Sequence, residues 1–174
     1  MLKWQIGDVT VTRVVEFESP VPYNKETPFF EEATPETLRT MTWLYPHFVQ
    51  EDGTLNLSVH ALLVEAKGLK LVVDTCVGND KPRNMTGQRP LHRPFLQHIA
   101  EAGFPRESVN TVVCTHLHVD HVGWNTMLEN GKWVPMIRIG LSAQSFSIAA
   151  RVTRAACLSL SKLGDHSGCP ICEG

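Results

Sequence analysis

The stretch THLHVDHVGWN, residues 115–125, concentrates three histidines and one aspartate within six consecutive positions. The apolar run NTVVC comes directly before it and is predicted to be a β-strand, so the polar side chains lie where a strand ends. In an extended chain alternate residues project to the same side, so His116, His118 and Asp120 can converge on one point. His121 then turns toward a neighbouring point. This spacing predicts a site for two adjacent metal ions.

The side chains of this cluster have the chemistry that metalloenzymes use. Imidazole and carboxylate ligands favour zinc and also accept iron, manganese or cobalt. A bound ion lowers the pKa of its water toward about 7, and two ions roughly 3.5–4 Å apart can hold one hydroxide and polarise a substrate oxygen. Asp120 would then be a ligand and the catalytic group that orients the nucleophile. The alternative of surface histidines without partners is disfavoured, because such dense clusters rarely lack a ligand role.

Length and composition limit the classes of protein that fit. The chain has 174 residues, of which 43% are hydrophobic, and this predicts one globular domain with its own core. A net charge of -2 without a run of lysine or arginine argues against a nucleic-acid or anionic-membrane partner. No segment has the pattern of a signal peptide or a membrane span, and five cysteines, an odd number, fit reduced thiols. We therefore expect a cytoplasmic protein.

Two β-hairpins are predicted upstream of the motif. The first covers residues 3–17 and turns at Gly7-Asp8, because apolar and polar residues alternate on both sides of this dipeptide. The second covers residues 57–75, turns at Lys67-Gly68, and is apolar enough on both faces to form a central pair of strands. Its second strand is expected to end at Asp74.

A loop and one helix are predicted between the two hairpins, and a second helix between the second hairpin and the motif. The prolines and polar residues of residues 19–30 indicate a loop. A helix then begins with Thr34 as its N-cap and Pro35 as its first residue, and continues to about Leu44. A second helix is predicted over residues 91–103, where apolar residues recur at helical spacing before a terminal glycine: Leu91, Phe95 and Ile99.

The pattern His-x-His-x-Asp-His in residues 116–121 resembles the motif of the metallo-β-lactamase-fold hydrolase superfamily. The run LKLVVDT is similar to the superfamily strand that ends in an aspartate supporting the metal site, here Asp74. The resemblance covers about residues 4–134 and implies an α/β fold, the N-terminal half of an αββα sandwich that this chain would present incompletely. Where the superfamily pattern reads Asp-Thr-Gly, this chain has Cys76 in place of glycine, a residue with less backbone freedom.

Carried over to this chain, the resemblance implies a role for each residue of the motif. His116 and His118 would bind the first of two zinc ions. Asp120 and His121 would bind the second. The continuation VGWN is similar to lactonase-like and organophosphate-hydrolase-like members, and Trp124 could form an apolar wall of the substrate pocket. RNA-processing members would bring a basic surface, which this sequence lacks, so the implied substrate is a small molecule.

The sequence changes character after residue 135. Superfamily members usually continue with a second sheet and further ligands, whereas residues 136–174 gather most of the serines and three of the five cysteines. We therefore divide the chain into a superfamily-type half, residues 1–135, and an atypical tail that a frameshift or a premature end would explain. Potential substitute ligands lie near the end of this tail: Asp165, His166, Cys169 and Cys172. Their short spacing from His121 and a lone Cys-x-x-C favour a solvent-exposed terminus.

Two functions remain open from the sequence. The first is a zinc-dependent hydrolase that uses a metal-bound hydroxide on a small ester, lactone or phosphoester substrate. The alternative is a truncated metal-binding fragment without enzymatic activity. Two zinc ions per chain with turnover would support the first, and at most one labile ion without turnover would support the second. The sequence does not decide the oligomeric state.

Overall fold

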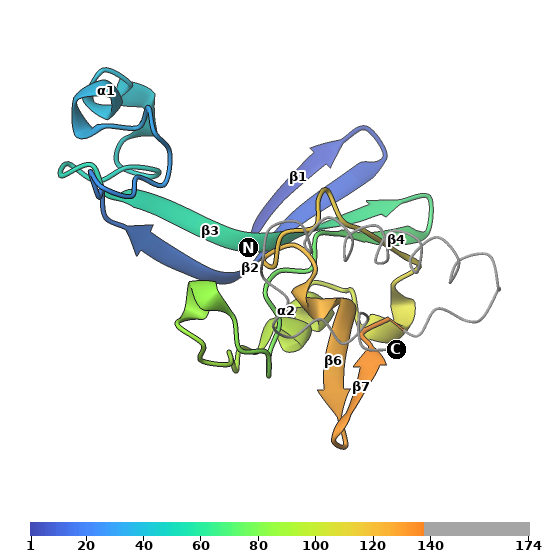
Figure 1. Ribbon diagram of the computed structural model, residues 1–174. Coiled ribbons are helices and arrows are strands. Elements are labelled where there is room, and N and C mark those ends of the chain that lie inside the picture. Colours follow the sequence, from blue (N-terminus) through green and yellow to red (C-terminus); the bar gives the residue numbers. More distant parts are fainter. Residues whose placement is uncertain (138–174) are drawn as a thin grey trace. The chain divides into compact units, whose positions relative to one another are not determined.

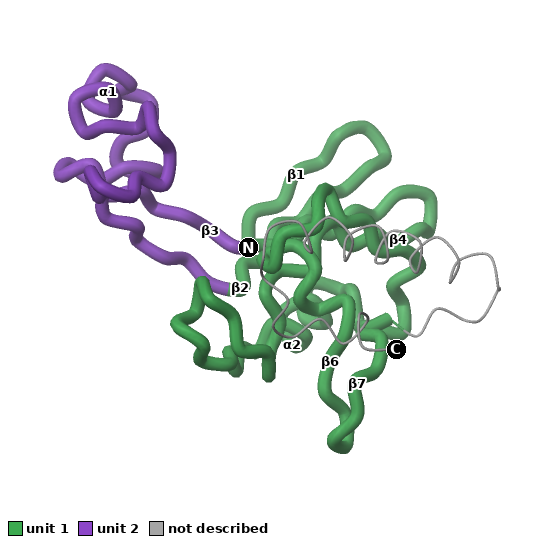
Figure 2. The backbone as a smooth tube through the Cα atoms, in the orientation of Figure 1, with its two compact units in different colours: residues 1–16, 60–174 green, residues 17–59 purple. Residues whose placement is uncertain are grey.

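The computed structural model describes residues 1–137, and in this range the chain is a mixed α/β protein. The chain consists of two compact units, shown in green and purple in Figure 2. Unit 1 comprises Met1–Glu16 together with the described residues from His60 onward, and unit 2 is Phe17–Val59. Length and composition alone gave no indication of this division. The whole metal-binding motif belongs to unit 1.

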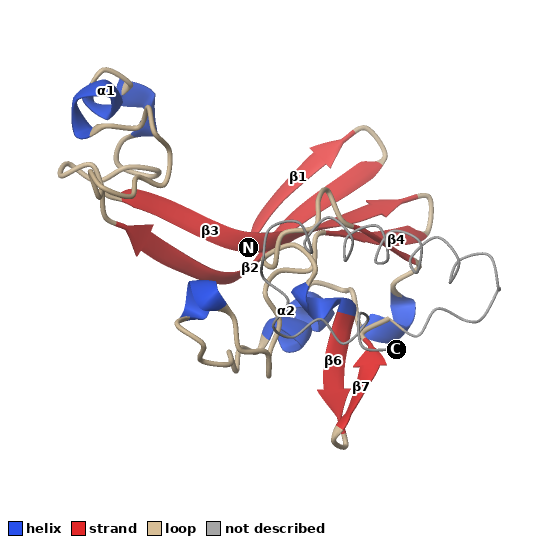
Figure 3. Cartoon of the chain, viewed as in Figure 1, coloured by secondary structure: helices blue, strands red, loops and turns tan. Residues whose placement is uncertain are grey.

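The main sheet has five strands in the order β1-β2-β3-β4-β5 (Figures 1 and 3). Its strands are β1 (Leu2–Ile6), β2 (Val9–Val21), β3 (Leu55–Ala66), β4 (Leu69–Val73) and β5 (Thr111–Val113). The pairs β1–β2 and β3–β4 are antiparallel, whereas β4 and β5 are parallel. Because β4 and β5 are parallel neighbours, the segments that follow them leave the sheet at the same edge. Those segments begin with Asp74 and with the histidine motif.

Both predicted hairpins are confirmed. Each has a two-residue turn, since Ile6 pairs with Val9 in the first and Ala66 pairs with Leu69 in the second. Lys67 and Gly68 have φ angles of 48° and 80°, the left-handed backbone that such turns require. The second hairpin lies in the interior of the strand order, as its apolar faces predict.

The expected loop over residues 19–30 is wrong at its start, because β2 continues through Pro20 to Val21. Pairing between β1 and β2 ends at Arg13, which pairs with Leu2. Beyond that point β2 has no β1 neighbour. A proline, which cannot donate a backbone hydrogen bond, is tolerated on such an unpaired side of a strand.

Both predicted helices exist but are shorter than expected. The first, α1 (Pro35–Arg39), begins as predicted, since the Thr34 hydroxyl accepts the Thr37 N–H at 3.2 Å. It is followed by a separate 3-10 turn, η1 (Thr42–Leu44). The second, α2 (Phe95–Glu101), begins after Pro94, because a proline disfavours helical backbone in the residue before it. Two further 3-10 turns flank α2, η2 (Asn84–Thr86) and η3 (Arg106–Ser108).

A second, two-stranded sheet follows the motif. The 3-10 turn η4 (Gly123–Asn125) leads into the hairpin of β6 (Thr126–Glu129) and β7 (Lys132–Pro135). Met136 and Ile137, where the sequence analysis places the start of the tail, are buried with 1% and 7% of their surface exposed. The rest of the tail lies outside the described residues, including the four potential ligands Asp165, His166, Cys169 and Cys172.

The core of unit 1 joins the sheet to α2. Its fully buried side chains include Leu63 of β3, Val72 of β4, and Phe95 and Ile99 of α2, each 0% exposed. The helical spacing of Phe95 and Ile99 in the sequence predicts their burial on one face of α2. Across the described part of the chain, every helix falls short of the length and hydropathy that a membrane-crossing segment needs.

Candidate metal site

The four residues of the motif lie together in the loop between β5 and η4. The rings of His116 and His118 are nearly perpendicular, with centroids 4.8 Å apart, and the rings of His116 and His121 are 3.8 Å apart. The Asp120 Oδ2 atom lies 3.3 Å from His121 Nε2. His116 and His118 are exposed, whereas Asp120 and His121 are half-buried. The structure therefore brings the predicted ligands into one cluster at the surface.

The backbone of the motif is bent and not extended. The His121 N–H donates to the His118 carbonyl at 3.0 Å, a turn that folds the end of the motif back on its start. The alternate-residue geometry of a strand therefore does not apply, and the expectation that His121 turns away is wrong. In the turn, the His121 ring lies beside His116.

Asp74, the predicted supporting carboxylate, lies directly against His121. Its Oδ2 atom is 2.9 Å from His121 Nδ1, and its Oδ1 accepts the Thr115 N–H at 2.7 Å. The Thr115 hydroxyl donates to Oδ2 at 2.8 Å. Burial raises the pKa of Asp74, but the Thr115 donors and His121 outweigh this effect and hold the pKa below its ordinary value. An ionised Asp74 therefore orients the His121 imidazole.

The donor set fits a zinc-type ion in its chemistry. Three imidazoles and two carboxylates in mutual contact are the nitrogen and oxygen ligands that such ions take. Within residues 1–137, however, no three His, Cys, Asp or Glu side chains are arranged as a group that could hold a metal ion. Asp120 and His121, the pair expected to bind the second ion, contact each other. Metal binding would replace this contact by ligand bonds from both residues.

Two segments cross closely behind the cluster, one following Asp74 and the other following His121. The Thr75 N–H donates to the His121 carbonyl at 2.8 Å, and the Trp124 N–H donates to the Thr75 carbonyl at 2.8 Å. The Gly123 N–H donates to the Cys76 carbonyl at 2.7 Å. These backbone bonds fix the ligand loop to the end of β4.

Glycine at position 123 allows this crossing. A Cβ atom on Gly123 would overlap the carbonyl group of Val77, and a Cβ atom on Gly78 would lie 2.7 Å from the carbonyl of Gly123. Two backbones can approach this closely only where neither carries a side chain.

Cys76 occupies the position where the superfamily pattern has glycine. Its φ angle is 52°, in the left-handed region that residues other than glycine rarely adopt. The side chain is fully buried, and this burial raises the pKa of the Cys76 thiol. The thiol therefore stays protonated in the metal-free protein.

Sequence reasoning missed Glu16, a carboxylate on β2 that is only 7% exposed. It accepts the N–H groups of Val77 at 2.9 Å and Gly78 at 3.1 Å, and the indole N–H of Trp124 at 2.6 Å. A signal was present in the sequence. Glu16 follows the buried Val14 by two residues in an alternating strand, so it stands at an inward position where an apolar residue is expected.

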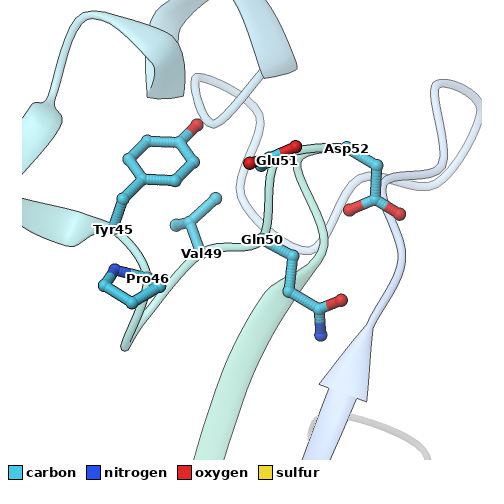
Figure 4. Close-up of a pocket in the computed structure, with 6 residues that line it drawn as sticks. All are labelled: Tyr45, Pro46, Val49, Gln50, Glu51 and Asp52. Atoms are coloured by element: carbon cyan, nitrogen blue, oxygen red, sulfur yellow. The ribbon is translucent and has the colours of Figure 1, made fainter.

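The expectation that Trp124 lines a substrate pocket is wrong. Trp124 is 3% exposed and stacks on Phe95, with ring centroids 5.6 Å apart. A hollow of about 570 Å³ does occur in unit 2, and it contains no residue of the motif (Figure 4). It is lined by Tyr45, Pro46, Val49, Gln50, Glu51 and Asp52.

The fold and the cluster identify the class of protein. The model of the metallo-beta-lactamase superfamily matches residues 55–157, and the chain belongs to this superfamily. The matched range continues past residue 135, where the sequence analysis divides the chain. No curated protein sequence matches the chain.

Solved structures share the fold at low sequence identity. A probable metal-dependent hydrolase from Staphylococcus aureus is 19% identical, with a TM-score of 0.50, over 70% of this chain and 42% of that protein. AidC, a dizinc quorum-quenching lactonase, is 20% identical, with a TM-score of 0.51, over 70% and 37%. The hydrolase AbOPH of the beta lactamase superfamily is 23% identical, with a TM-score of 0.55, over 79% and 41%. The chain thus spans less than half the length of each of these proteins.

Proposed function

We propose that the protein is a zinc-dependent hydrolase that acts on a small ester, lactone or phosphoester. One observation carries this proposal, the contact cluster of three imidazoles with Asp120 and Asp74 at the ends of two parallel neighbouring strands. Membership of the metallo-beta-lactamase superfamily supports it. The similarity to AidC, a dizinc quorum-quenching lactonase, favours a small-molecule substrate.

In this proposal His116 and His118 hold a first zinc ion, and Asp120 and His121 hold a second. When bound, the ions lower the pKa of water to about 7 and so provide a nucleophile at neutral pH. Asp120 orients that nucleophile toward the substrate. The exposure of His116 supports a site that a substrate can reach from solvent.

Thr115 and Asp74 set which ring nitrogens face the ions. Asp74 accepts the Nδ1–H of His121, so the opposite nitrogen, Nε2, would be the ligand atom. The Thr115 hydroxyl donates to Asp74 and lies 3.1 Å from His116 Nδ1, from which it can accept. His116 would therefore also bind through Nε2. These contacts keep the ring protons of His116 and His121 on Nδ1, so that Nε2 of each ring is free to bind an ion.

The remaining parts of the proposal concern location and partners. Cys76 and Cys114 are free thiols among the described residues, which supports a reducing, cytoplasmic location. The net charge of -2 favours small-molecule substrates over nucleic acid or a membrane surface.

A second candidate function is a metal-binding fragment without activity. The contact between Asp120 and His121 favours this candidate, because it occupies the two residues that a second ion would need.

Zinc stoichiometry and turnover together test the proposal. Purified protein is analysed for zinc and assayed on a lactone, an aryl ester and a phosphotriester, before and after chelation. We expect two zinc ions per chain and a hydrolysis that chelation abolishes and zinc restores. His118→Ala should lose both, whereas His47→Ala, an exposed histidine in unit 2, should lose neither. Fewer than two ions with no turnover of any substrate would leave the fragment as the better description.

A further inference from the structure

Glu16 connects three parts of the chain that are distant in sequence. It lies on β2, and its donors come from the segment after β4, through Val77 and Gly78, and from the segment after the motif, through Trp124. The bond between Glu16 and Trp124 joins residues 108 positions apart. A carboxylate with three N–H donors and 7% exposure is a built feature of the interior.

The donors of Glu16 belong to the two segments that carry Asp74 and His121. Val77 lies three residues beyond Asp74, and Trp124 lies three residues beyond His121. Between them, the Thr75 N–H bonds to the His121 carbonyl, so the two segments are already in register. Glu16 joins the two segments again through Val77 and Trp124, three residues beyond Asp74 and His121.

A carboxylate is the one side chain group that suits this position. All three neighbours donate hydrogen, and only an acceptor-only group can meet three donors at once. An amide in its place would direct its NH₂ group at an N–H donor. Burial raises the pKa of Glu16, while the N–H groups of Val77, Trp124 and Gly78 and the charge of Arg93 oppose that rise.

We propose that Glu16 is a positioning residue for the metal site. By accepting the N–H groups of Val77 and Gly78 and the indole N–H of Trp124, it fixes how far the Asp74 segment lies from the His121 segment. This distance sets the orientation of the His121 ring, and with it the geometry of the second ion. The inference rests on the proposed function for its effect on catalysis, but its effect on His121 does not require a metal.

The test compares Glu16→Gln with Glu65→Gln. Glu65 is exposed on β3, so its variant makes the same change of charge on the same sheet without touching the site. In metal-free protein, the Nδ1–H proton resonance of His121, which depends on its bond to Asp74, is followed by NMR. Glu16→Gln should shift or abolish this signal, and Glu65→Gln should leave it unchanged. An unchanged signal in folded Glu16→Gln protein would overturn the proposal.

Metal-loaded protein provides the second measurement. Glu16→Gln should lower the affinity for the second zinc ion by about 10-fold or more, the usual effect of losing a group that orients a ligand. In cobalt-substituted protein the visible absorption band should change, and kcat should fall while KM stays within about twofold. A lower melting temperature with unchanged zinc affinity, spectrum and kcat would show a structural role alone and overturn the proposal.

Two further outcomes are distinguishable. If wild-type protein binds fewer than two zinc ions and shows no turnover, the proposed function fails, yet the metal-free NMR comparison still tests Glu16. If Glu16→Gln does not fold, Trp124→Phe removes only the indole donor and keeps both backbone donors. It should shift the His121 signal in the same direction by a smaller amount, and no shift would overturn the proposal.

Discussion

The ligand loop has an outer and an inner side that differ in burial and in the kind of contact they make. On the outer side, His116 and His118 are exposed, and the His116 ring contacts the rings of His118 and His121. On the inner side, Gly123 and Trp124 are buried and are held by backbone bonds and by Glu16. The side chains that would bind metal therefore contribute little to holding the loop, which is held by backbone bonds and by the buried side chains of Glu16 and Trp124.

The largest expected effect is that of Gly123→Ala on the inner side. Its Cβ would overlap the Val77 carbonyl, and neither backbone can move without breaking the bonds behind the cluster. We expect a loss of about 5 kcal/mol or more in the free energy of unfolding, or failure to fold, as measured by urea denaturation. Gly131→Ala is the matched control. Gly131 has a positive φ angle of 75°, but a Cβ atom there would have no neighbour within 4 Å. This variant should therefore cost about 1 kcal/mol in the free energy of unfolding. Equal losses in the two variants would contradict the close crossing.

Phe95→Ala should have the next largest effect. Phe95 is fully buried and stacks on Trp124, so the variant leaves a cavity directly beneath the inner side of the loop. The expected loss is about 4 kcal/mol in the free energy of unfolding. Phe48→Ala, at an exposed phenylalanine of unit 2, should change it by less than about 1 kcal/mol. A loss for Phe95→Ala as small as this would mean that the loop does not rest on α2.

Lys81, which contacts the β6–β7 hairpin after the ligand loop, makes the free energy of unfolding dependent on pH. Its ammonium group donates to the Thr126 carbonyl at 2.8 Å and lies 4.2 Å from the centre of the Trp133 ring. Burial, with a smaller contribution from the charge of Arg83, lowers the pKa of Lys81 to about 8. An unfolded lysine has a pKa of about 10.4. Between these values the unfolded chain binds more protons, so the free energy of unfolding should rise with pH.

The measurement compares wild type with Lys81→Met from pH 7 to pH 10. The stability of wild type relative to the variant should be constant below about pH 8 and then rise by roughly 1.4 kcal/mol per pH unit, to about 3 kcal/mol in all. Cysteines titrate in the same range in both proteins, so their contribution cancels in the difference. A difference that does not change with pH would rule out a buried, perturbed Lys81.

The smallest effect on stability is expected on the outer side. His118→Ala in metal-free protein should change the free energy of unfolding by no more than about 0.5 kcal/mol, because the side chain lies at the surface. The same variant should lose zinc, as measured by titration with a chromophoric chelator. If metal-free His118→Ala protein lost much more stability than this, His118 would help to hold the loop as well as to bind metal.

The local features of this molecule were predictable from sequence. The hairpin turns at Gly7-Asp8 and Lys67-Gly68 follow from adjacent residues, and both are confirmed. The motif lies in a loop after a strand, as the apolar run before it predicts. Membership of the superfamily agrees with the pattern in residues 116–121. Each of these depends on residues a few positions apart.

The features that sequence reasoning missed depend on distant contacts. The burial of Trp124 against Phe95 and the role of Glu16 require knowledge of which segments meet across the fold. The bend that brings His121 beside His116 depends on hydrogen bonds of the turn, which a strand pattern does not represent. A local pattern therefore predicted the candidate ligands but not the contacts that support them.

The Glu16–Trp124 bond also has a consequence for the order in which the chain assembles. Closing a loop of 108 residues costs more chain entropy than closing either two-residue hairpin turn, so contacts of this range form late in folding. The two hairpins need only neighbouring residues and can form while the chain is still being synthesised. Trp124 must leave the ribosome before Glu16 can accept its indole N–H. We therefore expect the ligand loop to be the last part of unit 1 to become ordered, and the histidines to be competent for metal only when the β-strands are already in place.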